Sequence, residues 1–447
     1  MRLITLILDS SADSGTQRKM DGRSLLLKRF GELKHDDDEE SSKRIKTAMC
    51  AVIVATVINK VTLHYTVPNR LPPTVRDRSP LVTKILALQD SGLFKRMYRL
   101  DYRDFQHALV CITPLMQKRV LTTSIPMIVK LAVALRFLAG AIYLDLSFGY
   151  DIDHNNIHHV IFDTIKAIDD CKDPFLDNIR FPTNRVDLMT VEAGFSRLSG
   201  NRLRGTASAG DGVVFRMFAP LPWEVNADVV SWYVRKGYYA YGLQAFCDSA
   251  TKFLFISSKL CSSAHDSAQY AVSALSKFIK DKKLLPGFHV VLDDAYICCD
   301  QELSPWKGRS LSVEKDAFNY YLSLHRQCIE RAFGILVSRW GIFWRPLKVS
   351  MEHRAMVIRV CCKLHNICVD RFGVENPPVM TRRNASRDID VQYGDAAVAE
   401  FSDEFVIRAG YRSDLEISTD RDTLTQVLKD GNVERPQHSK HSRVRRS

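Results

Sequence analysis

Strand-like and helix-like segments alternate between about Gly205 and Phe372, and this order constrains the fold of the chain more than any other feature. The strand-like runs are short, apolar and rich in aromatic residues, whereas the helix-like runs repeat apolar residues every three or four positions. In chain order, these runs are strands at 238–247 and 253–260, a helix at 266–282, a strand at 289–292 and a helix at 313–337. Alternating strands and helices predict a mixed α/β or α+β sheet with flanking helices.

Composition and pattern divide the chain into four parts. Residues 1–90 combine an acidic cluster, basic residues and four prolines, which is typical of a variable, weakly structured leader. Residues 91–175 are helical in pattern, and residues 205–372 form the alternating region. Residues 373–447 are polar, contain prolines and end in RPQHSKHSRVRRS, which predicts a largely disordered tail with a basic end.

The helical part contains short runs joined by tight turns. In order, they are 127–138, then 143–148 after Gly140, and then 156–168 after Asp153, a good N-cap. Two or three short helices joined in this way suit a helix-turn-helix unit, a common DNA-binding element. Small helical bundles that bind no DNA share the pattern, so the residues alone leave this role open.

The charge balance makes a polyanionic partner plausible. Lys and Arg number 63 against 51 Asp and Glu, which gives a net charge of +12 and a pI of about 9.1. Nucleic acid and an anionic membrane surface both fit this excess. The longest apolar run, at 47–58, is shorter than the roughly 20 residues of a membrane-spanning helix, so no membrane partner is expected. Eleven cysteines without an export signal predict reduced thiols, and thus the cytosol or the nucleus.

Three acidic residues lie where metal chemistry would need them. Asp211 lies between two glycines ahead of an apolar run, Asp293 ends the buried strand HVVL, and Glu330 lies on the long helix. The flanking glycines suggest that a ligand or nucleic-acid backbone could approach Asp211 closely. Carboxylates from separate segments can hold two Mg²⁺ ions about 4 Å apart, as in phosphodiester cleavage. A turn aspartate, a helix-capping aspartate and a solvated glutamate would show the same pattern, so spacing alone does not decide.

Several motifs in the same order resemble the PIF/Harbinger class of DDE transposases and the nuclease-like proteins derived from them. The resemblance covers roughly 205–369, with a weaker echo in the preceding helices. The motifs are glycine-flanked Asp211, Arg235-Lys236-Gly237, Gln244 to Asp248, Ser263 to Ser267, Asp293-Asp294-Ala295-Tyr296 with Pro305, Phe318-Asn319, Arg326, Ile329 to Gly334, and Leu364-His365-Asn366.

The resemblance implies a fold, a reaction and a set of site residues. It implies an RNase H-like fold, a divalent metal (Mg²⁺ or Mn²⁺), and DNA strand cleavage by an activated water. The family pattern Asp-x-x-Tyr places the second ligand at Asp293, with Asp294 as the fallback, and the third ligand falls on Glu330. Residues expected to contact DNA are Lys236, Arg331, His158 and His159. The nucleus is the expected location, with DNA, a separate DNA-binding accessory protein and a homo-oligomer as the expected partners.

Some features depart from this pattern or compete with it. The family commonly has Asp-Gly-Thr-His at the first ligand, whereas Val213 and Val214 follow Gly212 here, which leaves the substrate preference open. The rival hypothesis is a domesticated DNA-binding or scaffold protein that no longer cuts. A zinc site at Cys361, Cys362, His365 and Cys368 is disfavoured, because structural zinc sites usually pair ligands from separate segments. The terminal Arg443, Arg445 and Arg446 fit a nuclear address, a phosphate contact or chance.

Overall fold

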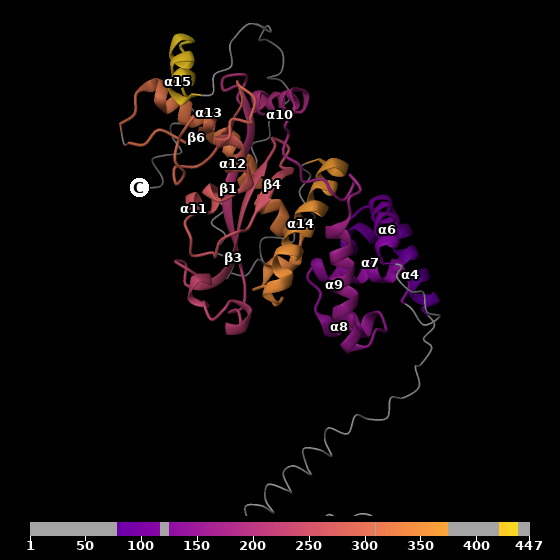
Figure 1. Ribbon diagram of the computed structural model, residues 1–447. Coiled ribbons are helices and arrows are strands. Elements are labelled where there is room, and N and C mark those ends of the chain that lie inside the picture. Colours follow the sequence, from indigo (N-terminus) through magenta and orange to yellow (C-terminus); the bar gives the residue numbers. More distant parts are fainter. Residues whose placement is uncertain (1–77, 117–124, 309, 374–419, 437–447) are drawn as a thin grey trace, which may run out of the picture. The chain divides into compact units, whose positions relative to one another are not determined.

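The computed structural model describes residues 78–116, 125–308, 310–373 and 420–436 (Figure 1). In the described ranges, six helices lie between residues 79 and 170. They are α4 (Ser79–Asp90), α5 (Phe94–Tyr98), α6 (Tyr102–Met116), α7 (Met127–Leu138), α8 (Tyr143–Gly149) and α9 (His154–Asp170). The helices expected between residues 127 and 168 are thus present. The described end of the expected leader is also helical, since α4 falls within it, and the rest of that leader lies outside the described residues.

Local chemistry explains where the last of these helices begins. The Asp153 carboxylate accepts a hydrogen bond from the Asn155 backbone N–H at 2.9 Å, so it caps α9 as the sequence predicts. Along α9, Ile157, Ile161 and Ile165 recur four residues apart and are all buried. This spacing places them on one face of the helix, which packs against α6 and α7.

A six-stranded mixed sheet forms the centre of the second half of the chain. Its strands are β1 (Thr206–Arg216), β2 (Tyr233–Val234), β3 (Tyr238–Cys247), β4 (Phe253–Ser257), β5 (His289–Val291) and β6 (Glu302–Leu303). Neighbouring strands follow the order β2-β3-β1-β5-β6, and β4 also pairs with β3. The β1–β3 and β3–β4 pairs are antiparallel, whereas β1–β5 and β5–β6 are parallel. The mixed sheet expected from the sequence is confirmed, and it is consistent with a DDE endonuclease fold.

Helices cover both faces of this sheet (Figure 1). They are α10 (Arg185–Leu198), α11 (Asp266–Ala271), α12 (Ala274–Lys280), α13 (Val313–Arg339) and α14 (Met351–Phe372), with single 3-10 turns at η1 (Pro222–Glu224), η2 (Val230–Trp232) and η3 (Gly341–Trp344). Alternate strand residues point to opposite faces. Ala209 and Val291 therefore pack in the core that contains α13 and α14, whereas Val290 and Leu292 pack in a second core with α12.

One expected helix is divided in two. The sequence pattern predicts a single helix over 266–282, whereas α11 ends at Ala271 and α12 begins at Ala274. Ser273 lies at the break, where its hydroxyl accepts a hydrogen bond from the Ser276 N–H at 3.1 Å. A serine that caps a new helix offers the backbone an alternative to continuing the first one.

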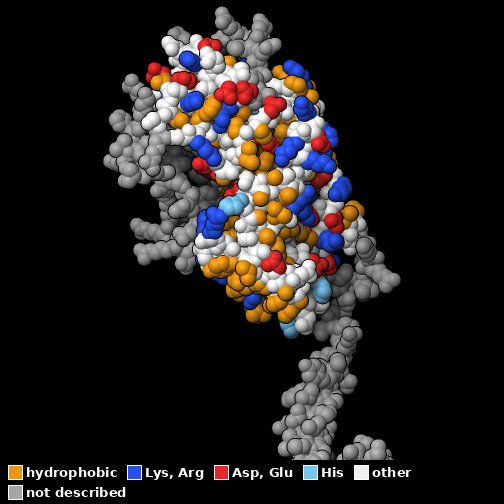
Figure 2. All heavy atoms as spheres, turned by 60° about the vertical axis from the view of Figure 1, so that its left-hand side comes forward, with side chains coloured by type: hydrophobic (Ala, Val, Ile, Leu, Met, Phe, Trp, Pro, Cys, Tyr) orange, Lys and Arg blue, Asp and Glu red, His pale blue; other side chains and the backbone are white. Residues whose placement is uncertain are grey.

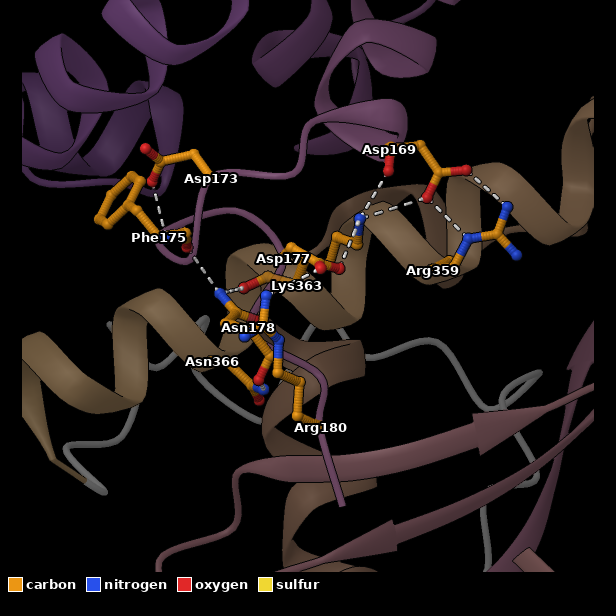
Figure 3. Close-up of polar contacts among 9 residues, drawn as sticks. All are labelled: Asp169, Asp173, Phe175, Asp177, Asn178, Arg180, Arg359, Lys363 and Asn366. Atoms are coloured by element: carbon orange, nitrogen blue, oxygen red, sulfur yellow. Dashed lines mark hydrogen bonds and ion pairs between the residues drawn. The ribbon is translucent and has the colours of Figure 1, made fainter. Parts of the chain in front are cut away.

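The segment after α9 joins the helical part to α14. Asp169 forms an ion pair with Arg359 of α14 at 2.5 Å, and the Lys363 ammonium donates to the Asp169 carbonyl at 2.7 Å (Figure 3). Farther along the segment, the Asn178 amide donates to the Lys363 carbonyl at 3.1 Å. The ring of Phe162 also stacks on His353 with centroids 4.2 Å apart. The helical part and the sheet region therefore share an extensive contact through α14.

Part of the expected disordered tail is ordered. Residues 420–436 include α15 (Arg421–Asp430), which packs against α13. Trp306 anchors this helix, because its indole N–H donates to the Thr425 hydroxyl at 3.0 Å and the Arg421 guanidinium lies 3.8 Å from its ring centroid. The polar composition of the tail does not predict this short amphipathic helix, in which Leu424 and Leu428 are buried. The remainder of the tail lies outside the described residues.

None of the helices in the described ranges combines the length and apolar character required to span a membrane.

Candidate active site

The pairing of β1 with β5 brings two of the three candidate carboxylates together. These strands are parallel and in register at Ala209 and Val291, so Asp211 and Asp293 each follow two residues farther along. A step of two residues returns a side chain to the same face of a sheet. Since Ala209 and Val291 face α13, both carboxylates are directed toward that helix as well.

Glu330 of α13 is linked to the other two carboxylates by an arginine that forms ion pairs with both Glu330 and Asp211. The Arg326 guanidinium lies one helical turn before Glu330 and forms ion pairs with Glu330 and with Asp211, the latter at 3.7 Å. The Asp211 side chain is 18% exposed and the Glu330 side chain 40%. Among the described residues, the oxygens of the three carboxylates do not all lie within 4.8 Å of one another, so Arg326 is what joins Glu330 to the pair.

Electrostatics show that this group carries more negative charge than its protein surroundings compensate. Burial, together with the neighbouring Asp293, raises the pKa of Asp211 to about 7. Burial also raises the pKa of Asp293 and that of Asp266, and the Asp266 carboxylate is further affected by Asp293. Buried carboxylates that repel each other favour a bound cation or a proton. The oxygen donors and their charge therefore fit a hard divalent cation.

A cavity of about 540 Å³ opens beside Asp211, Asp266 and Glu330, whereas Asp293 is not among its lining residues. Figure 2 shows one face of the molecule with a hollow in its surface. Acidic side chains lie at this hollow, and a histidine and basic side chains lie beside them. At the cavity wall, the Arg235 guanidinium contacts the His265 ring nitrogen Nε2 at 2.7 Å. The lining includes Asp211, Lys236, Asp266, Glu330, Trp344 and Arg345.

Sequence reasoning did not assign Asp266 and Arg326 to the site. Both lie in motifs that support the family resemblance, but their spacing gives no role. Asp266 begins α11 and receives a hydrogen bond from the Gln244 amide at 3.3 Å, which brings a fourth carboxylate to the cavity. Arg326 could have been suspected from its position four residues before Glu330, because residues at this spacing on a helix are neighbours.

A buried polar junction connects the elements that carry the triad. The Thr206 hydroxyl of β1 contacts His289 Nε2 of β5 at 3.1 Å and His325 Nδ1 of α13 at 2.9 Å. All three side chains are fully buried. β1 and α13 also carry Asp211 and Glu330, and Asp293 follows the end of β5. The hydrogen bonds of this junction therefore hold together the three elements that position the carboxylates.

Gly210 serves packing on the opposite face of the sheet, whereas Gly212 lies beside Asp266 at the cavity wall. A Cβ at Gly210 would lie 2.2 Å from the Phe246 ring, and one at Gly212 would lie 2.4 Å from an Asp266 carboxylate oxygen. At Gly210 the space without a side chain is thus filled from within, whereas close approach of a ligand at Gly212 stays a prediction.

Gly210→Ala is expected to lower the free energy of unfolding by about 1–3 kcal/mol, because the added methyl group overpacks the core against Phe246. Gly334→Ala is a matched control on α13, since nothing lies within 4 Å of its added Cβ. It should raise stability by up to about 1 kcal/mol through helix propensity. Urea denaturation of both variants tests this, and equal stability of the two would contradict the packing argument.

The residues expected to contact DNA lie in different places. Lys236 is exposed and lines the cavity. Arg331 is exposed but lies near Cys247 and Cys328, outside the cavity lining. His158 and His159 are exposed on α9, where the His158 ring stacks on Tyr143 with centroids 3.9 Å apart. DNA contact by these residues remains a prediction.

The cysteine-rich stretch of α14 is part of the helix core. Cys361, Cys362 and Cys368 are buried, and both ring nitrogens of His365 are engaged. One contacts the Thr251 carbonyl at 2.9 Å and the other the Arg339 guanidinium at 3.3 Å. This arrangement leaves His365 without a free nitrogen for a metal, so these residues pack the helix core and do not form a zinc site.

This arrangement, a mixed sheet with acidic residues beside adjacent strands and a third on a covering helix, is similar to that of DDE nucleases. Residues 211–366 match the family described as DDE superfamily endonuclease. "Protein ALP1-like" from Arabidopsis thaliana is 28% identical over 144 residues, which is 29% of this chain and 35% of that protein. "Putative nuclease HARBI1" from Homo sapiens is 24% identical over 201 residues, which is 43% of this chain and 53% of that protein.

The resemblance to Harbinger-type, transposase-derived proteins is thereby confirmed over this part of the chain. The match spans about a third of one curated relative and about half of the other. No solved structure matches the chain.

Proposed function

We propose that the protein is a metal-dependent DNA endonuclease of the Harbinger type that hydrolyses phosphodiester bonds at a two-metal Asp-Asp-Glu site. The observation that carries this proposal is the parallel register of β1 and β5, which places Asp211 and Asp293 side by side and facing α13. The shared contact of Arg326 with Asp211 and Glu330 brings the third carboxylate to the same place. The family match covers all three residues.

The residues have separate roles in this mechanism. Asp211, Asp293 and Glu330 would hold two Mg²⁺ or Mn²⁺ ions, which supply an activated water and stabilise the leaving oxygen. Asp266 adds negative charge beside them. Arg326 pairs with Asp211 and Glu330 and would offset part of their negative charge. Lys236, at the cavity wall, would bind the phosphate backbone on either side of the scissile bond.

Location and partners follow from this activity and are part of the proposal. DNA is the substrate class, so the nucleus is the proposed location. α7, α8 and α9 are proposed to contact DNA, with His158 and His159 on the exposed side of α9. Sequence-specific binding could also involve a separate accessory protein, and paired cuts could involve a homo-oligomer.

The experiment that tests this function is nicking of supercoiled plasmid by the purified full-length protein. Nicking is expected with Mg²⁺ or Mn²⁺ and should stop when a chelator removes the metal. Binding of DNA without nicking in either metal would instead support the non-cleaving DNA-binding or scaffold hypothesis. Neither binding nor nicking would contradict both.

DNA affinity is expected to fall with salt. In Figure 2 the Lys and Arg side chains are spread over the visible face with acidic side chains between them, so phosphate contacts would come from several places. A protein that neutralises about six phosphates should lose roughly a thousandfold in affinity between 50 and 200 mM salt, with a log–log slope near −0.9 per phosphate. Fluorescence anisotropy at several salt concentrations measures this slope, and a flat response would show that the net charge of +12 is not used for DNA.

A further inference from the structure

A second cluster of metal-ligand side chains lies in the helical part of the molecule, apart from the carboxylates. His107 and Cys111 lie four residues apart on α6, and Asp173 follows the end of α9. Their ligand atoms all lie within 4.8 Å of one another, and this is the one such group of three among the residues that the structure describes. Residues four apart on a helix lie on the same face, so α6 presents imidazole and thiol together.

Cys171 lies beside this cluster and next to the Cys111 thiol, although its sulfur is not within 4.8 Å of all three donor atoms. It lies at the C-terminal end of α9, and its sulfur is 3.9 Å from the Cys111 carbonyl. Burial and the adjacent Asp173 and Cys171 raise the pKa of the Cys111 thiol to about 11. Both cysteines are free thiols. The donors thus come in two pairs, His-x-x-x-Cys from α6 and Cys-x-Asp from the segment after α9.

The two exposed donors of the cluster are held in place by the same residue. The Asp173 carboxylate accepts a hydrogen bond from the Phe175 backbone N–H at 2.9 Å (Figure 3). The His107 ring stacks on the Phe175 ring with centroids 4.0 Å apart. Phe175 is itself fixed, since its carbonyl accepts a hydrogen bond from Asn178, which also donates to α14. The outer partners that orient metal ligands have this kind of arrangement.

We propose that His107, Cys111, Cys171 and Asp173 form a structural Zn²⁺ site. Two thiolates, an imidazole and a carboxylate are donors that suit zinc better than magnesium. Tetrahedral zinc needs its donors roughly 3.3–3.8 Å apart, given metal–ligand distances of about 2.0–2.3 Å, so small side-chain rotations would close the cluster. The two pairs come from separate segments, as is usual in structural zinc sites.

The site would fasten two segments that are distant in sequence. α6 belongs to the helical part, whereas the segment at 171–180 leads from α9 toward the sheet and is anchored to α14 by Asn178. Zinc at this point would hold α6 against that segment. Its role is therefore structural and does not depend on cleavage at the carboxylates.

Titration of the full-length, reduced, metal-free protein with Co²⁺ tests the proposal. Cobalt bound by thiolates gives a sulfur-to-metal charge-transfer absorption that carboxylate ligands do not produce, which separates this site from Asp211 and Asp293. We expect this absorption in the wild-type protein and its displacement by one equivalent of Zn²⁺. We expect its loss in Cys111→Ser and in Cys171→Ser.

Matched variants separate the site from general effects on folding. His107→Gln and Asp173→Asn change exposed side chains, so they should fold and bind Co²⁺ at least tenfold more weakly, since even outer-shell partners cost about that much. Cys261→Ser, a free cysteine outside the cluster, should retain the charge-transfer absorption and the wild-type affinity. Absence of the absorption in the wild-type protein, or its persistence at full affinity in Cys111→Ser and His107→Gln, would overturn the site.

Discussion

Asp211→Asn, Asp293→Asn and Glu330→Gln are each expected to reduce plasmid nicking by at least about a thousandfold while DNA binding persists. Each change removes one negative charge and alters little volume, so the fold should survive. A bound metal supplies several kcal/mol of transition-state stabilisation, and about 4 kcal/mol corresponds to a factor of a thousand in rate. Quantification of nicked plasmid over time, with anisotropy to confirm DNA binding, measures the effect.

Asp294→Asn is the matched control for this series. Asp294 is the neighbour of Asp293 and is exposed, whereas the β1–β5 register aligns Asp293 with Asp211. Asp294→Asn should therefore retain most of the activity. The opposite result, with Asp293→Asn active and Asp294→Asn inactive, would move the second ligand by one residue and contradict the register argument.

The position of each of the first two carboxylates could be predicted from the sequence, because it depends on local patterns. Glycine-flanked Asp211 precedes an apolar run, and Asp293 ends a short buried strand, so each was expected at a strand. Their alignment, however, is set by hydrogen bonds between β1 and β5. These strands are about 80 residues apart in the chain, and no periodicity reports which strands become neighbours.

The residues that were missed depend on contacts between distant elements. Asp266 reaches the cavity because α11 begins beside β3, where the Gln244 amide bonds to it. Arg326 belongs to one of the motifs of the family resemblance, but its role depends on how α13 lies over β1. The glycines at 210 and 212 were interpreted from their lack of a side chain alone, and the side chains that fill the space come from β3 and α11.

Mild acid is expected to destabilise the protein through three buried histidines. Burial lowers the pKa of His289, His325 and His365 to about 3 each, with a smaller contribution from Arg339 at His365. The unfolded chain takes up protons near the ordinary value of 6.5, so the stability from these neutral rings is present above that pH and is lost as pH falls toward 3. Between pH 7 and 5.5 the loss is about 1.3 kcal/mol per ring, or about 4 kcal/mol in all.

Protonation of Asp211 opposes this loss of stability in mild acid, so the pH dependence of unfolding is best measured in a variant that lacks this carboxyl group. Its folded pKa of about 7 lies above its unfolded value, so its protonation adds stability as pH falls from 7. In the Asp211→Asn background, urea denaturation should show the free energy of unfolding falling by about 1.4 kcal/mol per pH unit for each histidine below pH 6.

His289→Gln should reduce this slope by the share of one ring, whereas His159→Gln, on the exposed side of α9, should leave it unchanged. An unchanged slope in His289→Gln would show that this ring is already charged in the folded protein, and the Thr206 junction that orders β1, β5 and α13 would need a different hydrogen-bond arrangement.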